Sequence, residues 1–452
     1  MVQKNEILEL EIVDITEEGN GVAKHDGFAV FIPNTAVGDR AQVRIVKVLS
    51  SYAFGRVERL ISPSKDRTDP GCAVFGRCGG CTLRHIGYET ELQLKYKWVA
   101  NHLRRIGGIE VVPEPILHTG RTAGYRNKAQ YPVRVEDGRV MTGFFAKRSH
   151  RIAASDLCDL QPALFEDILK EIRTFAEKQK IPVYDEQTHR GCLRHIYLRL
   201  AEKTGQVMVC LVLSGKGMPK EKLLVKRLTA RFPQIHSIMV NVNQKKTNVI
   251  LGDSCRTIYG ADYIVDELCG VKLCLSPLTF YQVNRDAAEL LYRQAQEYAQ
   301  LTGEETLLDL YCGAGSIGLS MAHRVKKLIG VEVVEAAVEN ARQNAKLNGI
   351  GNARFFCADA SSAAKRLAEE GTKPDVVIVD PPRKGCDKSV IESIVRMAPK
   401  RVVMISCNSA TAARDCRAFE EMGYQVIKAR PVDLFPRTGH VECVVLLTKT
   451  EK

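Results

Sequence analysis

Two residues near the end of the chain could act on a substrate as a pair. Cys407 follows the apolar segment RVVMIS, and the acid Glu442 lies 35 residues later (442−407) in the apolar segment HVECVV. A lone cysteine on an apolar strand is usually a packing residue. At the carboxyl end of a strand, however, its thiolate can serve as a nucleophile, and an acid buried among apolar residues has a raised pKa that suits it to proton transfer.

A glycine-rich loop precedes this pair in the chain. Gly313, Gly315 and Gly318 form a G-x-G-x-x-G pattern after the segment TLLDLY, and Glu332 ends the next strand-like segment 19 residues after Gly313 (332−313). Glycines let the backbone turn sharply and approach a ligand, and an acid at this spacing can bind ribose hydroxyls. NAD and S-adenosylmethionine both carry such a ribose, so the loop alone leaves both open.

The elements that must position these residues alternate between strand and helix from about residue 271 to 452. The predicted strands are TLLDLY, KLIGVEV, RFFCAD, DVVIVD and RVVMIS, with helical segments such as EAAVENARQNAKLNG and SVIESIVRMA between them. This alternation predicts a parallel, doubly wound α/β sheet of Rossmann-like type, and QVIKARPVDL and VECVVLLTK predict a closing strand pair. Asp359 and Asp380 then lie at carboxyl ends of strands, where such sheets bind ligands.

Four cysteines form a candidate metal site. Cys72, Cys78 and Cys81 are spaced C-x5-C-x2-C around the glycine-rich GRCGGC, and Cys158 follows in SDLCDL. Four thiolates suit zinc or a [4Fe–4S] cluster. Zinc sites more often use two C-x2-C pairs, whereas this segment has one, and the spacing leaves both metals open.

The rest of the chain predicts two further domains. Residues 1–60 contain short β segments separated by turn signals such as EEGNG, which is typical of a small barrel. Residues 61–270 mix strands and helices and predict an α+β domain with a mostly antiparallel sheet. Residues of about 91–124 begin with the helical segment ETELQLKYKWVANHLRRIGG, and we expect them to pack with the catalytic domain, 271–452.

Composition bears on the partner and the compartment. Lys and Arg total 65 against 53 Asp and Glu, a net charge of +12, which favours a polyanionic partner such as nucleic acid, although a merely basic protein accounts for the charge equally well. The N-terminus lacks a signal-peptide pattern, and no segment approaches the ~20 apolar residues of a membrane span. We therefore expect a cytoplasmic protein, not bound to a membrane, whose 15 cysteines are mainly reduced.

Several motifs resemble those of the RNA uracil-5-methyltransferase family. LDLYCGAGSIGL, VDPPRKG, ISCNSATAARD and RTGHVECVVLL are similar to the family's motifs, in particular to those of the 23S ribosomal RNA members of the RlmD and RlmCD type. The resemblance covers the whole chain. It implies a TRAM domain, an OB-like RNA-binding barrel, at residues 1–60, an iron–sulfur site at the cysteines, S-adenosylmethionine as methyl donor, and 23S rRNA as the RNA partner. We expect the enzyme to be a monomer.

The resemblance also implies roles for individual residues. Cys407 corresponds to the nucleophile and Glu442 to the base, and Cys72, Cys78, Cys81 and Cys158 correspond to the ligands of a [4Fe–4S] cluster, with zinc as the alternative. The S-adenosylmethionine site would comprise Gln282 in FYQVN, Tyr311, Gly313, Gly315, Glu332, Asp380, and Asp359 near the adenine. Ser316 stands where some members have Asn, so it is given no role.

Three alternatives remain open at this point. A nicotinamide-dependent dehydrogenase would account for the glycine loop but leaves the SCN and DPPR segments and Glu442 without a role. A non-catalytic RNA-binding protein of ribosome assembly would not need Cys407 together with Glu442. A tRNA uridine-5 methyltransferase would use the same chemistry on another RNA, and sequence does not exclude it.

Overall fold

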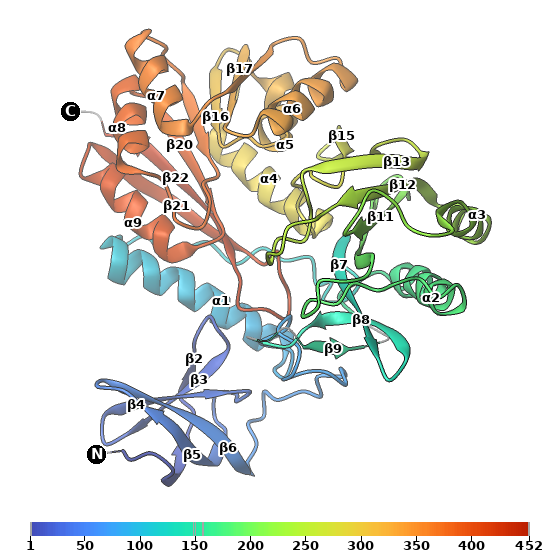
Figure 1. Ribbon diagram of the computed structural model, residues 1–452. Helices are drawn as coiled ribbons and strands as arrows, with labels where there is room; N and C mark the ends of the chain where they lie inside the picture. Colours follow the sequence, from blue (N-terminus) through green and yellow to red (C-terminus); the bar gives the residue numbers. More distant parts are fainter. Residues whose placement is uncertain (1, 148, 150, 156–157, 451–452) are drawn as a thin grey trace.

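The computed structural model describes residues 2–147, 149, 151–155 and 158–450, which fold into three domains (Figure 1). The N-terminal domain is built from these strands: β1 (Ile7–Glu11), β2 (Asp14–Ile15), β3 (Asn20–His25), β4 (Phe28–Pro33), β5 (Arg40–Val48) and β6 (Tyr52–Ser62). They join in the order β1-β5-β6-β4-β3-β2. Alternate residues of β1 are buried, as the period of a strand with one covered face requires. In the described residues the sheet is a half-barrel with edges at β1 and the very short β2.

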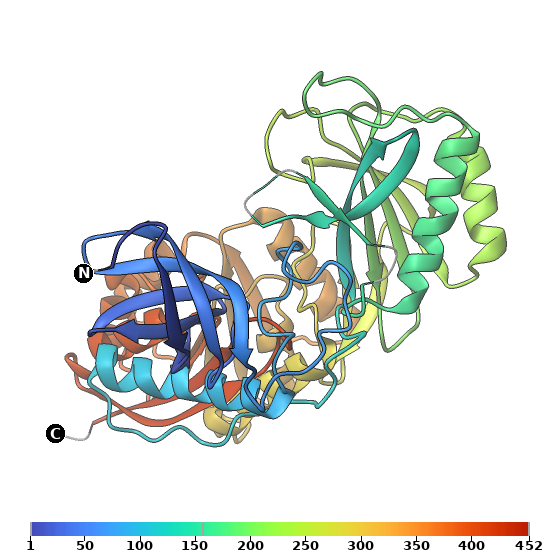
Figure 2. The ribbon, with the colours of Figure 1, turned by 90° about the horizontal axis from the view of Figure 1, so that it is seen from below.

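The central domain is a sheet with helices on one face. Its strands are β7 (Lys128–Glu136), β8 (Arg139–Phe145), β9 (Ile152–Ala154), β10 (Leu193–Leu200), β11 (Val207–Leu213), β12 (Ile235–Val242) and β13 (Ser254–Gly260). The order is β13-β12-β11-β10-β7-β8-β9, antiparallel except for the parallel pair β11–β12. Helices α2 (Ala163–Lys178) and α3 (Glu221–Arg231) cover one face (Figure 2). The other face packs on the C-terminal core, which explains why every residue of β11 is buried.

The C-terminal domain is the predicted doubly wound sheet. Its strands are β16 (Thr306–Leu310), β17 (Lys327–Glu332), β18 (Ala353–Cys357), β19 (Val376–Val379), β20 (Arg401–Ser406), β21 (Tyr424–Val432) and β22 (Glu442–Lys449). They lie in the order β18-β17-β16-β19-β20-β22-β21. The parallel pairing of β16 to β20 and the closing antiparallel pair β21–β22 confirm the sequence prediction.

Helices cover both faces of this sheet. One face holds α4 (Arg285–Ala299), α5 (Ser316–Met321), the 3₁₀ turn η2 (Ala322–Arg324) and α6 (Glu335–Leu347). The other holds α7 (Ala360–Glu369), α8 (Lys388–Met397) and α9 (Ser409–Glu420). A hairpin, β14 (Ile264–Leu268) and β15 (Val271–Leu275), joins the first face. None of the helices in the described part of the chain combines the length and apolar character needed to cross a membrane.

Helix α1 (Tyr88–His102) connects the N-terminal and C-terminal domains. It runs into a π-helical turn, η1 (Leu103–Gly107), and the two pack against the α9 face of the C-terminal sheet through Val99 and Leu103. On its other side the Trp98 indole N–H donates to the carbonyl of Ile15 at 3.0 Å. In Figure 1, α1 accordingly lies between the β2–β3 hairpin and α9. This helix therefore holds the N-terminal domain beside the C-terminal sheet.

Candidate active site

Cys407 and Glu442 lie opposite each other at the same edge of the C-terminal sheet. Strands β20 and β22 are antiparallel, and their pairing ends with Ser406 opposite Cys443. The next position along the chain from Ser406 is Cys407, and the residue just before Cys443 is Glu442. The Glu442 side chain is buried, at 4% exposed, whereas Cys407 is half-buried. The thiol therefore meets a cavity while the carboxyl is withdrawn behind it.

The two acids at this edge of the sheet have higher pKa values than ordinary carboxyls. Burial, together with the nearby Asp380 carboxylate and against the opposing Arg383 guanidinium, raises the pKa of Glu442 to about 8. Burial also raises the pKa of Asp380 to about 7. The pKa of the Cys407 thiol is raised by burial and by Glu442 and Asp380, and lowered by Arg383. A thiol, two carboxyls and one cation thus form a coupled group suited to exchanging protons near neutral pH.

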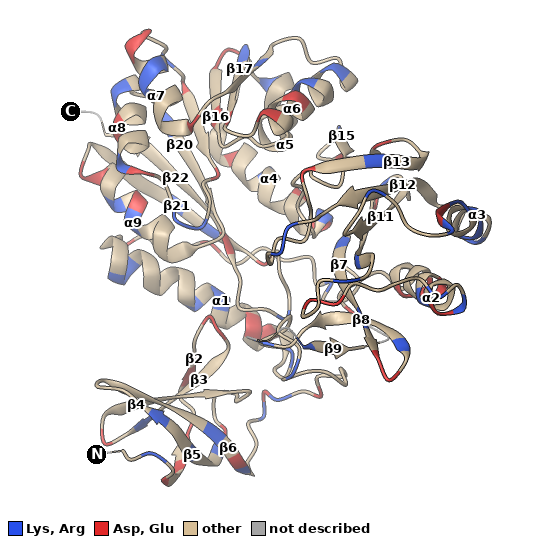
Figure 3. Ribbon diagram, in the orientation of Figure 1, with Lys and Arg blue, Asp and Glu red and all other residues tan. Residues whose placement is uncertain are grey.

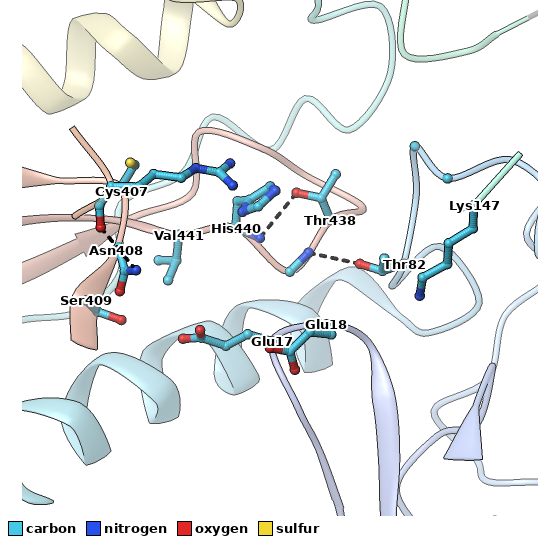
Figure 4. Close-up of a pocket in the computed structure, with 14 residues that line it drawn as sticks. Glu17, Glu18, Thr82, Lys147, Cys407, Asn408, Ser409, Thr438, His440 and Val441 are labelled. Carbon is cyan, nitrogen blue, oxygen red and sulfur yellow. Dashed lines mark hydrogen bonds between the residues drawn. The ribbon is translucent and has the colours of Figure 1, made fainter. Parts of the chain in front are cut away.

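A cavity of about 390 Å³ opens at Cys407 and is lined by all three domains (Figure 4). Its volume falls within the range of small-molecule sites. The C-terminal domain contributes the walls around Cys407, and Lys147 comes from the central domain. The residues that line it are Glu17, Glu18, Gly79, Gly80, Thr82, Lys147, Arg383, Cys407, Asn408, Ser409, Thr438, Gly439, His440 and Val441.

The N-terminal domain enters this cavity through the turn between β2 and β3. Glu17 on this turn accepts a hydrogen bond from Ser409, the first residue of α9. Burial raises the pKa of Glu17. The Ser409 hydroxyl also bonds His102 at 2.8 Å, and the His102 Nδ1 lies 3.6 Å from Glu17. A turn of the predicted RNA-binding domain therefore forms part of the wall beside the nucleophile candidate.

The glycine loop adopts the conformation that its sequence predicts. Gly313 and Gly315 have φ values of 54° and 79°, in the left-handed region that favours glycine, and Tyr311 has a φ of 66°. The Glu332 carboxylate accepts the Gly313 N–H at 3.1 Å and so pins the loop to the end of β17. At Gly318 a Cβ would lie 2.7 Å from the Asp309 carboxylate, which requires glycine there.

Buried acids face this loop. Asp309, on β16, accepts the Gly318 N–H at 2.9 Å through one oxygen, whereas its other oxygen is buried with no hydrogen-bond partner among the residues that the structure describes. Burial raises its pKa to about 8, and Asp380 and Glu332 raise it further. A nearby positive charge, such as that of S-adenosylmethionine, would favour the ionised form of this buried acid.

Of the remaining predicted cofactor residues, Asp359 lies near Tyr311, whereas no contact places Gln282 beside the glycine loop in the described residues. Asp359 is the N-cap of α7 and accepts the N–H groups of Ser361 and Ser362 at 3.0 and 3.2 Å. The pKa of Tyr311 is raised mainly by burial and then by the negative charges of Cys386, Asp387 and Asp359. Asp359 is therefore near enough to Tyr311 to affect its ionisation. Gln282 is buried, and its backbone carbonyl accepts the Asn127 amide at 2.9 Å.

The predicted metal ligands line a second cavity, of about 130 Å³, with Arg84 and Arg126 at its wall; the cysteines concerned are Cys72, Cys78, Cys81 and Cys158. Burial raises the pKa of Cys81 to about 12, and the neighbouring cysteines raise it further. Thiols in such a place ionise only beside a compensating cation. Within the described residues, no three His, Cys, Asp or Glu side chains are arranged to hold a metal ion, so metal binding stays a prediction.

Several residues of the site carry roles that sequence reasoning missed. Arg383 lies in the VDPPRKG segment and Asp309 in LDLY, and both segments resemble family motifs without assigning a role to these side chains. Asp309, like Glu442, is an acid within an apolar strand, and this pattern could have identified it. Glu17 and Thr82 carry no local signal, because their role depends on how the domains dock.

Comparisons with known proteins point to RNA methyltransferases. A family model described as tRNA (Uracil-5-)-methyltransferase matches residues 275–450, and a TRAM domain model matches residues 2–57. An uncharacterized RNA methyltransferase of Halalkalibacterium halodurans is 43% identical over 447 residues, 99% of this chain and 98% of that protein. One of Bacillus cereus is 42% identical over 452 residues, 100% of this chain and 98% of the relative.

One solved structure is similar across all three domains. It is the Pyrococcus abyssi tRNA (uracil-54, C5)-methyltransferase in complex with S-adenosyl-L-homocysteine, with a TM-score of 0.79 and 28% identity. The likeness covers 98% of this chain and 100% of that one. The order of the domains and their mutual arrangement are thus shared with an enzyme that binds the demethylated cofactor.

Proposed function

The chain belongs to the RNA uracil-5-methyltransferase family, and from this premise we propose that it methylates a uridine of 23S ribosomal RNA through a covalent bond between Cys407 and C6 of the base. The family membership makes it an S-adenosylmethionine-dependent enzyme acting on RNA, and it removes the dehydrogenase and the non-catalytic assembly protein from consideration. The observation that carries the proposal is that Cys407 directly follows β20 while the buried Glu442 begins the neighbouring strand β22, which places both residues at the same edge of the sheet.

The reaction needs both residues because C5 of uracil is a poor nucleophile. The Cys407 thiolate forms a bond to C6, and the electrons of the C5–C6 double bond move to make an enolate with nucleophilic C5. S-adenosylmethionine, when bound, supplies an electrophilic methyl group to C5 and leaves as S-adenosylhomocysteine. Glu442 then takes the C5 proton, the C5–C6 double bond reforms, and the thiolate is expelled. The enzyme is thereby restored with one proton on Glu442.

The electrostatics of the edge suit these two roles. A carboxyl whose pKa is about 8 holds its proton more tightly than an ordinary carboxyl, so Glu442 in its ionised form is a stronger base than usual. The pKa of Cys407 is raised overall by burial and by the two acids, and Arg383 opposes this rise and so favours the thiolate that attacks. Asp380 lies close enough to both residues to raise their pKa values, and we assign it to the uracil edge and to the cofactor.

The cofactor would be held along the carboxyl edges of β16, β17 and β19. By the family resemblance its contacts are Gln282, Tyr311, Gly313, Gly315, Glu332 and Asp380, with Asp359 near the adenine. The pinned loop at Gly313 and the buried Asp309 beside Gly318 support this placement, because the loop allows a ligand to approach the backbone closely and the acid would be favoured in its ionised form by a bound cation.

The cavity at Cys407 would hold the target nucleotide, turned out of its stack to expose C6. Lys147 and Arg383 offer positive charge to the phosphates on either side of it. Lys and Arg positions are spread over all three domains instead of gathering on one (Figure 3), which suits an RNA that contacts each domain. The +12 net charge supports the same conclusion.

The choice of 23S rRNA rests on the motif resemblance, and transfer RNA is the second candidate. The Pyrococcus abyssi enzyme that is similar across all three domains is a tRNA (uracil-54, C5)-methyltransferase, and this likeness favours the alternative. Deleting the gene and mapping 5-methyluridine in ribosomal and transfer RNA separates the two. We expect loss of the modification in 23S rRNA with tRNA unchanged, whereas loss in tRNA alone would overturn the assignment.

We further propose that the cysteine cavity binds a [4Fe–4S] cluster. Its four thiols are the donor set that such clusters use. A volume of about 130 Å³ is several times that of a single water, so it has room for more than one ion. Arg84 and Arg126 at the wall would offset the negative charge of the thiolates. Methyl transfer itself needs no electron, so the role is structural.

A further inference from the structure

Glu442 begins β22 immediately after an irregular loop, residues 433–441. This loop joins the two closing strands β21 and β22, and its last residues line the cavity beside Cys407. The Glu442 backbone pairs with Val432 of β21, and the direction from which the chain enters this pairing depends on what holds the loop.

The start of the loop is fixed by buried charges and hydroxyls. The Lys95 ammonium, which is fully buried on α1, donates to Asp433 at 2.7 Å and to the Phe435 carbonyl at 3.1 Å. The Tyr88 hydroxyl also donates to Asp433, at 2.8 Å, and the Tyr125 hydroxyl donates to the Pro436 carbonyl at 2.9 Å. These contacts all lie six or more residues before Glu442 (442−436).

The end of the loop is held by the segment that follows the third predicted metal ligand. Thr82 comes directly after Cys81, and its backbone N–H donates to the Arg437 carbonyl at 3.0 Å, as that of Leu83 does at 3.1 Å. The Gly439 N–H donates to the Thr82 hydroxyl at 3.0 Å, a bond drawn dashed in Figure 4. Among the described residues, this bond ties the loop to another part of the chain three positions before Glu442 (442−439).

Gly439 is also enclosed on its other side. A Cβ placed there would lie 1.6 Å from the carbonyl oxygen of Glu17, so the N-terminal turn packs directly on this backbone. The amide of Gly439 therefore has little freedom to find another partner within the protein. Removal of the Thr82 hydroxyl leaves this N–H to water in the cavity and loosens the backbone at Gly439 and His440, whereas Val441 stays packed in the core.

We propose that Thr82 is a positioning residue for the catalytic base: through Gly439 it holds Glu442 opposite Cys407 and so links the cysteine segment to proton removal. The inference rests on the proposed function, since it acts on the step assigned to Glu442. The expected effect is on one step of the reaction. Attack by Cys407 and methyl transfer do not use Glu442, so once RNA is bound, loosening the loop should slow the release of methylated RNA more than the two steps before it.

The test follows the covalent protein–RNA adduct in single turnovers with labelled RNA on denaturing gels. Thr82→Val keeps the shape of the side chain but removes the hydroxyl acceptor, Thr82→Ala removes it with a smaller side chain, and Thr82→Ser retains it. We expect Thr82→Val and Thr82→Ala to release product about 10- to 100-fold more slowly, the effect of a small displacement of a catalytic group, with methylated adduct accumulating. Thr82→Ser should stay near the native rate. Cofactor affinity and iron content should be unchanged in all three.

Other outcomes overturn the inference. Release within twofold of the native rate in Thr82→Val, or slow turnover with no adduct, means that Thr82 does not position the base. Failure of both Thr82→Val and Thr82→Ala to fold, with Thr82→Ser folded, marks the hydroxyl as structural only. Glu442→Gln is the internal reference: if it accumulates adduct and Thr82→Val does not, this inference alone fails, whereas absence of adduct in Glu442→Gln refutes the proposed function.

Discussion

Replacement of Glu442 by Gln should stabilise the protein, and by an amount that grows with pH. The unfolded chain ionises this carboxyl above its ordinary pKa of 4.5, whereas the folded protein holds the proton until the pH reaches about 8. Unfolding therefore releases a proton between these values, and the free energy of unfolding falls as the pH rises through that window. Gln is neutral in both states, so Glu442→Gln removes this penalty.

The magnitude follows from the two pKa values. Each pH unit within the window is worth about 1.4 kcal/mol, which gives a stability gain for Glu442→Gln of about 2 kcal/mol at pH 6 and about 4 kcal/mol at pH 8. The other buried acids are present in both proteins. The difference in unfolding free energy between Glu442→Gln and the native protein, here called the gap, should therefore grow by about 2 kcal/mol between pH 6 and pH 8 because of Glu442.

Thermal and urea unfolding of the native protein and of Glu442→Gln at pH 6, 7 and 8 measure this gap. Glu304→Gln, which makes the same chemical change at an exposed position before β16, is the matched control. A gap for Glu442→Gln that is constant across this range would show that the carboxyl is ionised in the folded protein throughout. The account of Glu442 as a strong, buried base would then be wrong.

Two further predictions concern the ligands. Glu332→Ala should weaken S-adenosylmethionine binding by roughly 1.5–3 kcal/mol, because it removes acceptors for the ribose and frees the Gly313 amide that pins the loop; unchanged affinity by calorimetry would remove Glu332 from the site. Protein purified without oxygen should be brown and contain about four irons per chain, whereas stoichiometric zinc without iron under those conditions would overturn the [4Fe–4S] assignment.

Much of the C-terminal site could be predicted from sequence because its signals are local. Strand, glycine loop, helix and acid follow one another in the chain, and a parallel sheet brings their carboxyl ends to one edge. Asp309 carries a signal of the same kind, an acid within the apolar strand LLDL, and the sequence therefore contains the means to find it. The arrival of Glu442 at the same sheet edge as Cys407 was not predictable, because it depends on β22 returning antiparallel beside β20.

The walls contributed by other domains could not be predicted, because they depend on docking. Glu17 reaches the cavity because Trp98 and Lys97 on α1 bind the backbone of Ile15 and the carboxylate of Asp14. These contacts join residues 83 positions apart in the chain. Nothing in the turn TEEGN distinguishes such a role from that of an exposed acidic loop. Thr82 is similar, since its partner Gly439 lies 357 positions away.

The most direct test of the proposed mechanism is the covalent adduct formed with 5-fluorouridine-containing RNA. The native enzyme should be trapped on this RNA after methyl transfer, since fluorine cannot leave C5 as a cation, and a denaturing gel should show a shifted, methyl-labelled band. Cys407→Ala should bind S-adenosylmethionine but give no band, whereas Glu442→Gln should give the band even with ordinary uridine. Adduct formation by Cys407→Ala would show that another cysteine is the nucleophile. Normal turnover by Glu442→Gln would show that the proton goes elsewhere.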